Sequence, residues 1–517
     1  MVDVEGQLGG KIAEMNQEER LARQVLVGAL VGGLVLRMIA IIWGDLDPGG
    51  DGLQRLWNTV EWAAHPRWIG LSGVWPPLHN YLLGGLIWVW KEPVWLARGL
   101  NLLMGMTSLL VLRAAIRPRH GDLVASVAML LLAFNWTHIW LTSSYWVEPP
   151  YLLLVFGALY FAEEARAGGR ARDAWATGLC LALAVLLRHE GVLLIALFAG
   201  WFSWHVRPWR QGLQMMVLPV IACCWQWVEP WWMGGSYFDF VETYRYLKSS
   251  ENRVHGFALG DRLEQLLLMP AVVPSLLVVI PGFLGLWADR KRWRDDLFGW
   301  LFATHLLFML WMTFQSGWRP QLRYVLLYFV LLFPAAALTW VRWAQRGKKP
   351  YVLLCLLILM VGIQASGWYV GRNERRPWGW LPLRIRTEAQ ISLDDWVRER
   401  RDRLAKWPGA EPVEIVHIVT GALEQPWRLP HSLLLGGVYL PAAQVREYNL
   451  AYQPQILAGT LPPDLLKADL VVLDTRMGGA SSLIAELTNQ VKEARIEKIH
   501  PHVTILLLTP LAQQLLR

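Results

Sequence analysis

The chain has 517 residues, of which 54% are hydrophobic and only 17% are charged. A soluble globular protein carries about 25% charged residues, so the composition excludes that class and indicates a membrane protein. The net charge of +8 does not indicate nucleic-acid binding, because the basic residues are spread over short loops. The four cysteines lie within apolar segments without CxxC spacing, and no disulfide framework is predicted.

The apolar segments predict a polytopic α-helical protein with about 11 transmembrane helices, since a helix needs about 20 residues to cross a bilayer. Residues 1–21 are polar and precede the first of them. The segment 174–206 is divided into two spans, because the tripeptide Arg188-His189-Glu190 interrupts it. The predicted spans are therefore 22–43, 95–112, 123–141, 149–162, two within 174–206, 212–229, 266–287, 297–314, 322–340 and 351–369.

The charges of the connecting loops predict the orientation of these spans. With a cytoplasmic N-terminus, all the short basic loops fall on the cytoplasmic side, as the positive-inside rule requires: 113–119, 166–172, 207–210, 290–294 and 342–349. The opposite loops are acidic or mixed, and the longest early one is 44–94. Residues 78–90 are apolar but short, and we expect them to form a juxtamembrane helix on the outer face. The location predicted is the bacterial plasma membrane.

The composition changes after the last span. Residues 22–370 are therefore predicted to form the transmembrane domain, and residues 371–517 a small soluble extracytoplasmic α/β domain. Short apolar runs predict strands at 413–419, 469–474 and 502–509. Helices are predicted at 392–407 and 481–494. This domain contains neither GxGxxG after a strand nor GxxxxGK[ST], and no nucleotide site is predicted in it.

Asp51 is the first candidate for chemistry. It follows the first span and opens the amphipathic segment DGLQRLWNTVEWAA. One explanation is an N-cap, in which the carboxylate accepts backbone N–H groups of the helix. The other is catalysis, and both can hold, because a capped carboxylate is already oriented. Asp45 and Asp47 are rivals for the same role.

His79 and Glu148 are further candidates at the predicted outer face. His79 lies in WPPLHNY, where it is either an interfacial anchor or a contact for a lipid headgroup. Glu148 lies in SSYWVEPPYLL, where Pro149 and Pro150 begin a span. An acid there is explained by the dipole of the helix. The short loop also keeps it near the membrane surface, where a charge is a hypothesis of function.

Two groups of arginines break the charge bias at the same face. Arg188 lies with His189 and Glu190 between two spans, and Arg319 and Arg323 lie in QSGWRPQLRY. Salt bridges or contacts with lipid phosphates explain such residues without a site. The alternative is a phosphate-bearing substrate, because the guanidinium fork matches phosphate oxygens.

In their order, these residues resemble the C-type (GT-C) membrane glycosyltransferases, which include protein O-mannosyltransferases and bacterial transferases that use polyprenyl-phosphate sugars. The resemblance covers about residues 20–340 and rests on DGLQRLWNTVEWAA, PPLHNYL, ARGLNLLMG, Glu148 and the sequence RHE. It implies a GT-C-like fold and transfer of a sugar from a polyprenyl phosphate to an acceptor on the extracytoplasmic face. It also implies Asp51 as general base and Glu148 as the acid that orients the acceptor or assists the base. The sequence departs from the pattern at Gly52 and Arg55, where Arg55 stands at a position usually held by tyrosine.

The transfer reaction requires groups that hold the departing phosphate. Substrate binding is accordingly predicted at His79, Arg188, His189, Glu190, Arg319 and Arg323. No metal-binding motif is present and no metal ligand is predicted, although a divalent metal bridging carboxylate and phosphate is compatible with the chemistry. The acceptor is a glycan, a lipid or a protein. The alternative functions are a lipid-linked glycan polymerase or ligase, a transporter or flippase, and a structural partner in an envelope complex.

Overall fold

The structure is a computed structural model that describes much of the chain. The described residues are 4–42, 49–64, 66, 76–90, 93–205, 209–232, 275–290, 295–315, 322–346, 413–418, 443–448, 470–474, 484–485, 487–489, 491, 494–500 and 503–508. The predicted span 351–369, the predicted helix 392–407 and the residues Asp45, Asp47 and Arg319 lie outside this set. The chain divides into two compact units, residues 1–44, 67–83 and 95–383 in unit 1 and residues 45–66, 84–94 and 384–517 in unit 2.

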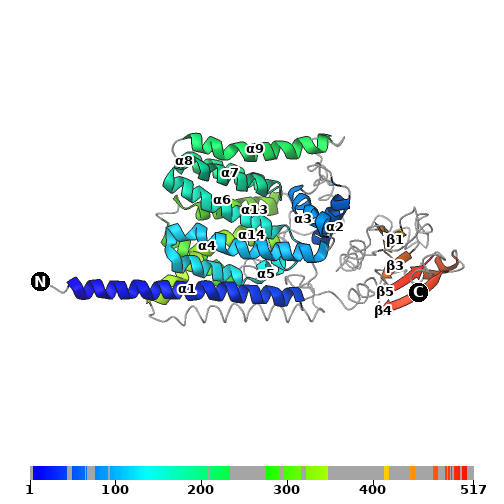
Figure 1. Ribbon diagram of the computed structural model, residues 1–517, viewed down its shortest axis with the longest axis horizontal. Helices are drawn as coiled ribbons and strands as arrows, with labels where there is room; N and C mark the ends of the chain where they lie inside the picture. Colours follow the sequence, from blue (N-terminus) through cyan, green and yellow to red (C-terminus); the bar gives the residue numbers. More distant parts are fainter. Residues whose placement is uncertain are drawn as a thin grey trace. The chain divides into compact units, whose positions relative to one another are not determined.

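Unit 1 is a helical bundle, in which Figure 1 shows α6, α7 and α9 side by side. Small residues allow the helices to approach closely. A Cβ added to Gly178 would collide with the backbone of Met215 on α9, and one added to Gly285 would collide with the Ala335 carbonyl on α15. The helices are α1 (Val4–Ile42), α4 (Pro93–Ala133), α5 (Trp136–Thr142), α6 (Glu148–Gly168), α7 (Ala171–Val185), α8 (Gly191–His205), α9 (Trp209–Trp232), α12 (Leu276–Ala288), α13 (Leu297–Gln315), α14 (Leu322–Phe329), the 3-10 turn η3 (Val330–Leu332) and α15 (Phe333–Arg346).

Within the described residues, three helices are long and apolar enough to cross a membrane: Gln17–Ile42, Pro93–Ala133 and Arg323–Arg346. Shorter apolar helices are Gly191–His205, Leu276–Ala288 and Leu297–Trp311. The classification as a helical membrane protein agrees with these segments, and the total of about eleven spans remains a prediction.

One predicted boundary is confirmed and one predicted span is divided. The segments 95–112 and 123–141 were expected to be separate spans, and the helical geometry of α4 is interrupted between them at Gly121, whose φ is 84°. The expected span 123–141 is itself broken at Asn135, whose side-chain oxygen accepts a hydrogen bond from the His138 N–H and starts α5. An asparagine cap within an apolar run thus divides what hydropathy alone reads as continuous.

The break predicted within 174–206 is confirmed, because α7 ends at Val185 and α8 begins at Gly191. The helix predicted at 78–90 is also present, as α3 (Leu78–Val89), which lies partly in each unit. Its Leu78 N–H donates a hydrogen bond to the Leu186 carbonyl, at 2.9 Å. The start of α3 is therefore fixed to the turn between α7 and α8.

Unit 2 contains the helix α2 (Gly49–Ala64), a short part of α3 and a sheet. A Cβ added to Gly84 of α3 would collide with the ring of Trp62 on α2, so the two helices approach closely there. The strands are β1 (Val413–Ile418), β2 (Ala443–Tyr448), β3 (Leu470–Asp474), β4 (Arg495–His500) and β5 (Val503–Leu507), in the order β2-β1-β3-β5-β4. β1 pairs in parallel with β2 and β3, whereas β5 pairs antiparallel with β3 and β4. β1, β3 and β5 are at the predicted positions.

Candidate functional site

Glu148 is the first residue of α6, with proline in the first turn as predicted. Its side chain is 0% exposed, so water does not screen a charge there. Burial of an unpaired carboxylate would be prohibitively costly, and a cation must therefore lie beside it. The loop of residues 143–147 that leads to Glu148 is itself buried.

Arg188 supplies that cation from the turn between α7 and α8. Its Nη1 donates to Oε1 of Glu148 in a very short contact, and its Nη2 donates to Oε1 of Glu190 at 2.8 Å. The turn is tight, because a Cβ on Gly191 would lie 2.7 Å from the backbone of Val185. Glycine at position 191 is thus what allows the turn to place Arg188 against α6.

Arg323 approaches the same carboxylate from α14. Its Nε lies 3.8 Å from Oε1 of Glu148, and its guanidinium lies 4.7 Å from the ring centre of Trp146. Tyr324 is within reach of both arginines, 4.9 Å from the guanidinium of Arg188 and 5.1 Å from that of Arg323. We call Glu148, Arg188, Glu190 and Arg323 the carboxylate–arginine cluster.

Glu190 and Arg188 keep their charges in the buried turn between α7 and α8. Burial alone would raise the pKa of Glu190, but the ion pair and hydrogen bond with Arg188 outweigh it and lower that pKa to about 2. Burial would lower the pKa of Arg188, but Glu190 and Glu148 together raise it well above its ordinary value. Both groups are therefore ionised at neutral pH.

Two polar atoms of the cluster are buried without a hydrogen-bond partner among the described residues. They are Oε2 of Glu148 and Nε of Arg188. Buried polar atoms are nearly always paired in folded proteins, and exceptions concentrate where a ligand or catalytic group completes the site. The Glu148 carboxylate can therefore accept one more hydrogen bond, and the Arg188 guanidinium can donate one more.

The other predicted site residues are distributed over both units. His79 is buried on α3. It follows Leu78, whose backbone N–H donates a hydrogen bond to the turn that carries Arg188. His189 lies within that turn. Asp51 lies in unit 2, and its expected position at the N-cap is wrong, because α2 begins two residues earlier at Gly49. Helical geometry in the two preceding glycines places Asp51 in the first turn of α2 and not at its N-cap.

Comparison with solved structures identifies the fold. ArnT from Cupriavidus metallidurans, determined with undecaprenyl phosphate bound, matches 94% of this chain and 98% of its own length with a TM-score of 0.59 and 15% identity. An oligosaccharyltransferase from Archaeoglobus fulgidus, determined with zinc and sulfate, matches 90% of this chain and 69% of its own length with a TM-score of 0.52 and 12% identity. The chain has the fold of the GT-C transferases. The fold implied by the sequence resemblance is confirmed, whereas no protein-family model and no curated protein matches the sequence itself.

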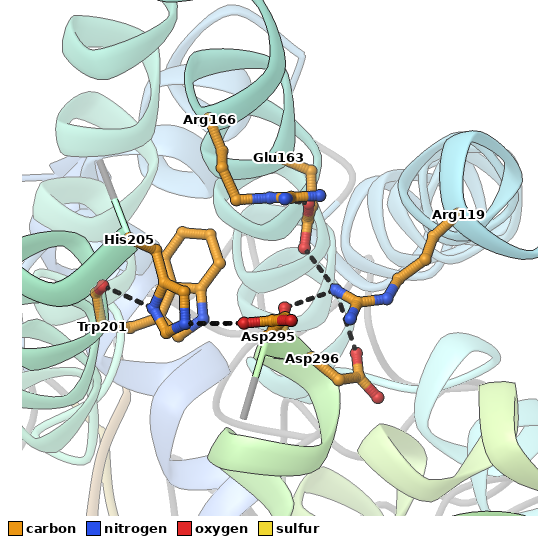
Figure 2. Close-up of polar contacts among 7 residues, drawn as sticks. All are labelled: Arg119, Glu163, Arg166, Trp201, His205, Asp295 and Asp296. Atoms are coloured by element: carbon orange, nitrogen blue, oxygen red, sulfur yellow. Dashed lines mark hydrogen bonds and ion pairs between the residues drawn. The ribbon is translucent and has the colours of Figure 1, made fainter. Parts of the chain in front are cut away.

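In this GT-C fold, a second polar cluster lies at the other end of the same helices. α6 and α8 begin in the carboxylate–arginine cluster and end in the contacts of Figure 2. Arg119 lies 3.4 Å from Glu163 and 3.8 Å from Asp296, and His205 lies 3.4 Å from Asp295. These contacts join α4 near Gly121, the last turns of α6 and α8, and the residues just before α13.

Sequence reasoning missed two buried polar residues that contact α5 and the loop 143–147. Arg37 of α1 is 0% exposed, and its partners among the described residues include two neutral groups, Oγ1 of Thr142 at 2.9 Å and Nδ1 of His138 at 2.6 Å. Asn101 of α4 is 2% exposed and bonds to the loop 143–147. An arginine inside the predicted span 22–43 was a usable signal, because charge at membrane depth is rare. Within the described residues, no group of three or more His, Cys, Asp or Glu side chains could hold a metal ion.

Proposed function

We propose that the protein is a membrane glycosyltransferase that moves a sugar from a polyprenyl-phosphate donor to an acceptor on the extracytoplasmic face of the bacterial plasma membrane. The observation that carries the proposal is the buried carboxylate–arginine cluster at one end of a bundle with the GT-C fold. ArnT, which shares the fold, was determined with undecaprenyl phosphate bound. Guanidinium groups are well suited to a lipid phosphate, since their donors match its oxygens.

The reaction is a single displacement. A carboxylate removes the proton of an acceptor hydroxyl or amine, and the acceptor atom attacks the anomeric carbon of the donor. The bond between that carbon and the phosphate oxygen breaks, its electron pair leaves with the phosphate, and the polyprenyl phosphate is released. The configuration at the anomeric carbon is inverted. The role of base is assigned to Asp51 by the sequence resemblance alone. Binding of the donor phosphate is argued from the arginines of unit 1.

The residues of the cluster take different parts in this proposal. Arg323, whose Nε lies 3.8 Å from Oε1 of Glu148, contacts the donor phosphate together with Arg319. Arg188 is already engaged by Glu148 and Glu190, and it offers its remaining Nε to the same phosphate. Glu148 orients the acceptor through Oε2, and His79 and His189 bind the polar part of the substrate.

Two experiments test the proposal. In cells, the Asp51→Asn protein is expected to be made and inserted normally but to transfer no sugar, so that a polyprenyl-phosphate sugar accumulates in lipid extracts examined by mass spectrometry. Glu61→Gln, which removes a carboxylate from the same helix α2, is the matched control and should transfer normally. Normal transfer by Asp51→Asn would move the base to Asp45, Asp47 or Glu148. Lipid-linked sugars that are identical with and without the protein would end the proposal.

In the second experiment, the binding of undecaprenyl phosphate to purified protein is measured in detergent. Loss of a charge-assisted hydrogen bond in Arg323→Ala should weaken binding about tenfold or more. Arg342→Ala removes the same charge near the other end of the apolar segment Arg323–Arg346 and should bind as the wild type does. Equal affinity of all three proteins would remove Arg323 from the phosphate site.

A further inference from the structure

The loop of residues 143–147 is buried, although it has no regular secondary structure. Ser144 is 1% exposed and Trp146 is 4% exposed. A buried loop leaves backbone carbonyl groups without partners unless a side chain supplies them. Here the supplier is Asn101 of α4, whose Nδ2 donates to the carbonyls of Ser144 and Trp146, both at 2.7 Å.

These two carbonyls flank Tyr145, and only Val147 separates Trp146 from the first residue of α6. The ring of Trp146 lies 4.7 Å from the guanidinium of Arg323. Glu148 follows two residues later and receives the hydrogen bond from Arg188. The N-cap residue of α6, Val147, makes no side-chain capping hydrogen bond, so the helix does not fix its own start in that way. The direction of the loop is instead set from outside, by Asn101.

We propose that Asn101 is a positioning residue of the transfer reaction. Through the carbonyls of Ser144 and Trp146, it holds the Trp146 ring against Arg323 and the first residue of α6 against Arg188. The inference rests on the proposed function, because it assigns Asn101 an effect on the arginine that binds the lipid phosphate. Asn101 makes no contact with the phosphate in this proposal and acts only through the loop.

The test is a double-mutant cycle with Asn101→Leu and Arg323→Ala, with binding of undecaprenyl phosphate as the readout. Leucine has the same number and branching of side-chain heavy atoms as asparagine and donates no hydrogen bond, so both loop carbonyls lose their partner. Asn101→Ser, a milder change, is measured in parallel and replaces Asn101→Leu if that protein does not fold. We expect Asn101→Leu to weaken binding about tenfold, and to weaken it less than about twofold when Arg323 is already alanine, because residues that act through one another are not additive.

A control separates positioning from loss of stability. Thr339→Val removes a buried hydrogen bond to the Pro281 carbonyl, 2.8 Å long, between α15 and α12. It should lower the unfolding temperature and leave the affinity for undecaprenyl phosphate unchanged. Wild-type affinity in both Asn101 variants, or an equal further loss on top of Arg323→Ala, would overturn the inference and leave the proposed function intact. Wild-type protein that does not bind undecaprenyl phosphate would overturn the proposed function and this inference with it.

Discussion

Arg188→Met should destabilise the protein by about 3–5 kcal/mol, since removal of one partner of a buried ion pair leaves the other charge uncompensated. The geometry supports the upper part of this range. Glu148 is 0% exposed and Arg188 is 4% exposed, so water does not screen the pair. A second carboxylate, Glu190, loses its partner in the same variant, but it is 25% exposed and contributes less. Methionine fills most of the volume, and the cost is therefore electrostatic rather than a cavity.

The assay is equilibrium unfolding of the purified protein in mixed micelles, with Glu148→Gln and the double variant Arg188→Met/Glu148→Gln measured beside it. In the double variant neither the cation nor the Glu148 charge remains, so its cost should be well below the sum of the two single costs. Arg342→Met, at the end of α15, is the control and should change stability by less than about 1 kcal/mol. A cost below about 1 kcal/mol for Arg188→Met, or strict additivity in the double variant, would refute the reasoning.

Three further predictions concern other contacts. Gly191→Ala places a Cβ 2.7 Å from the backbone of Val185 and should cost about 1–3 kcal/mol in unfolding experiments, whereas Gly200→Ala on the same helix meets no atom within 4 Å and should cost nothing. Glu190 has a lowered pKa, about 2 against an ordinary 4.5, so it stabilises the fold above pH 4.5 and this contribution is lost as the pH falls towards 2. The unfolding temperature of Glu190→Gln should therefore depend less on pH in that window, and an identical profile would contradict this. Arg37→Lys should lower the free energy of unfolding by about 2 kcal/mol, because a single ammonium group cannot replace the hydrogen bonds that separate guanidinium nitrogens make to Thr142 and His138. Unchanged stability would show that those bonds contribute little.

Much of the helical layout could be predicted from hydropathy and charge. The break at Arg188 is visible because a charged tripeptide cannot continue an apolar span. The break at Asn135 is not, since one asparagine hardly changes the hydropathy of its surroundings. Hydropathy has the same limit in the sheet, where it predicts only the apolar strands β1, β3 and β5. β2 and β4, with the sequences AQVREY and RIEKIH, lie at the edges of the described sheet and are too polar to be recognised as strands.

The candidate site was predictable in its residues but not in its pairing. Glu148, Arg188 and Arg323 stood out because each charge adjoins an apolar span. That Arg188 is shared by two carboxylates depends on the packing of α6 against the turn after α7, which no local pattern contains. Asn101 was missed for the same reason, since its role is defined only by carbonyl groups more than 40 residues away along the chain.

The buried guanidinium of Arg37 also constrains how the protein is made. Thr142, one of its acceptors, follows 105 residues later, so α1 leaves the ribosome long before that partner exists. A lone arginine at the centre of a membrane helix costs about 2.5–3.5 kcal/mol on insertion scales. Arg37, however, is close to Ile42, where the span ends, and a long side chain there can reach the headgroups. A nascent chain that stops before α5 should thus hold its first helix at a shallower depth, and the arrival of α5 should draw the arginine inward.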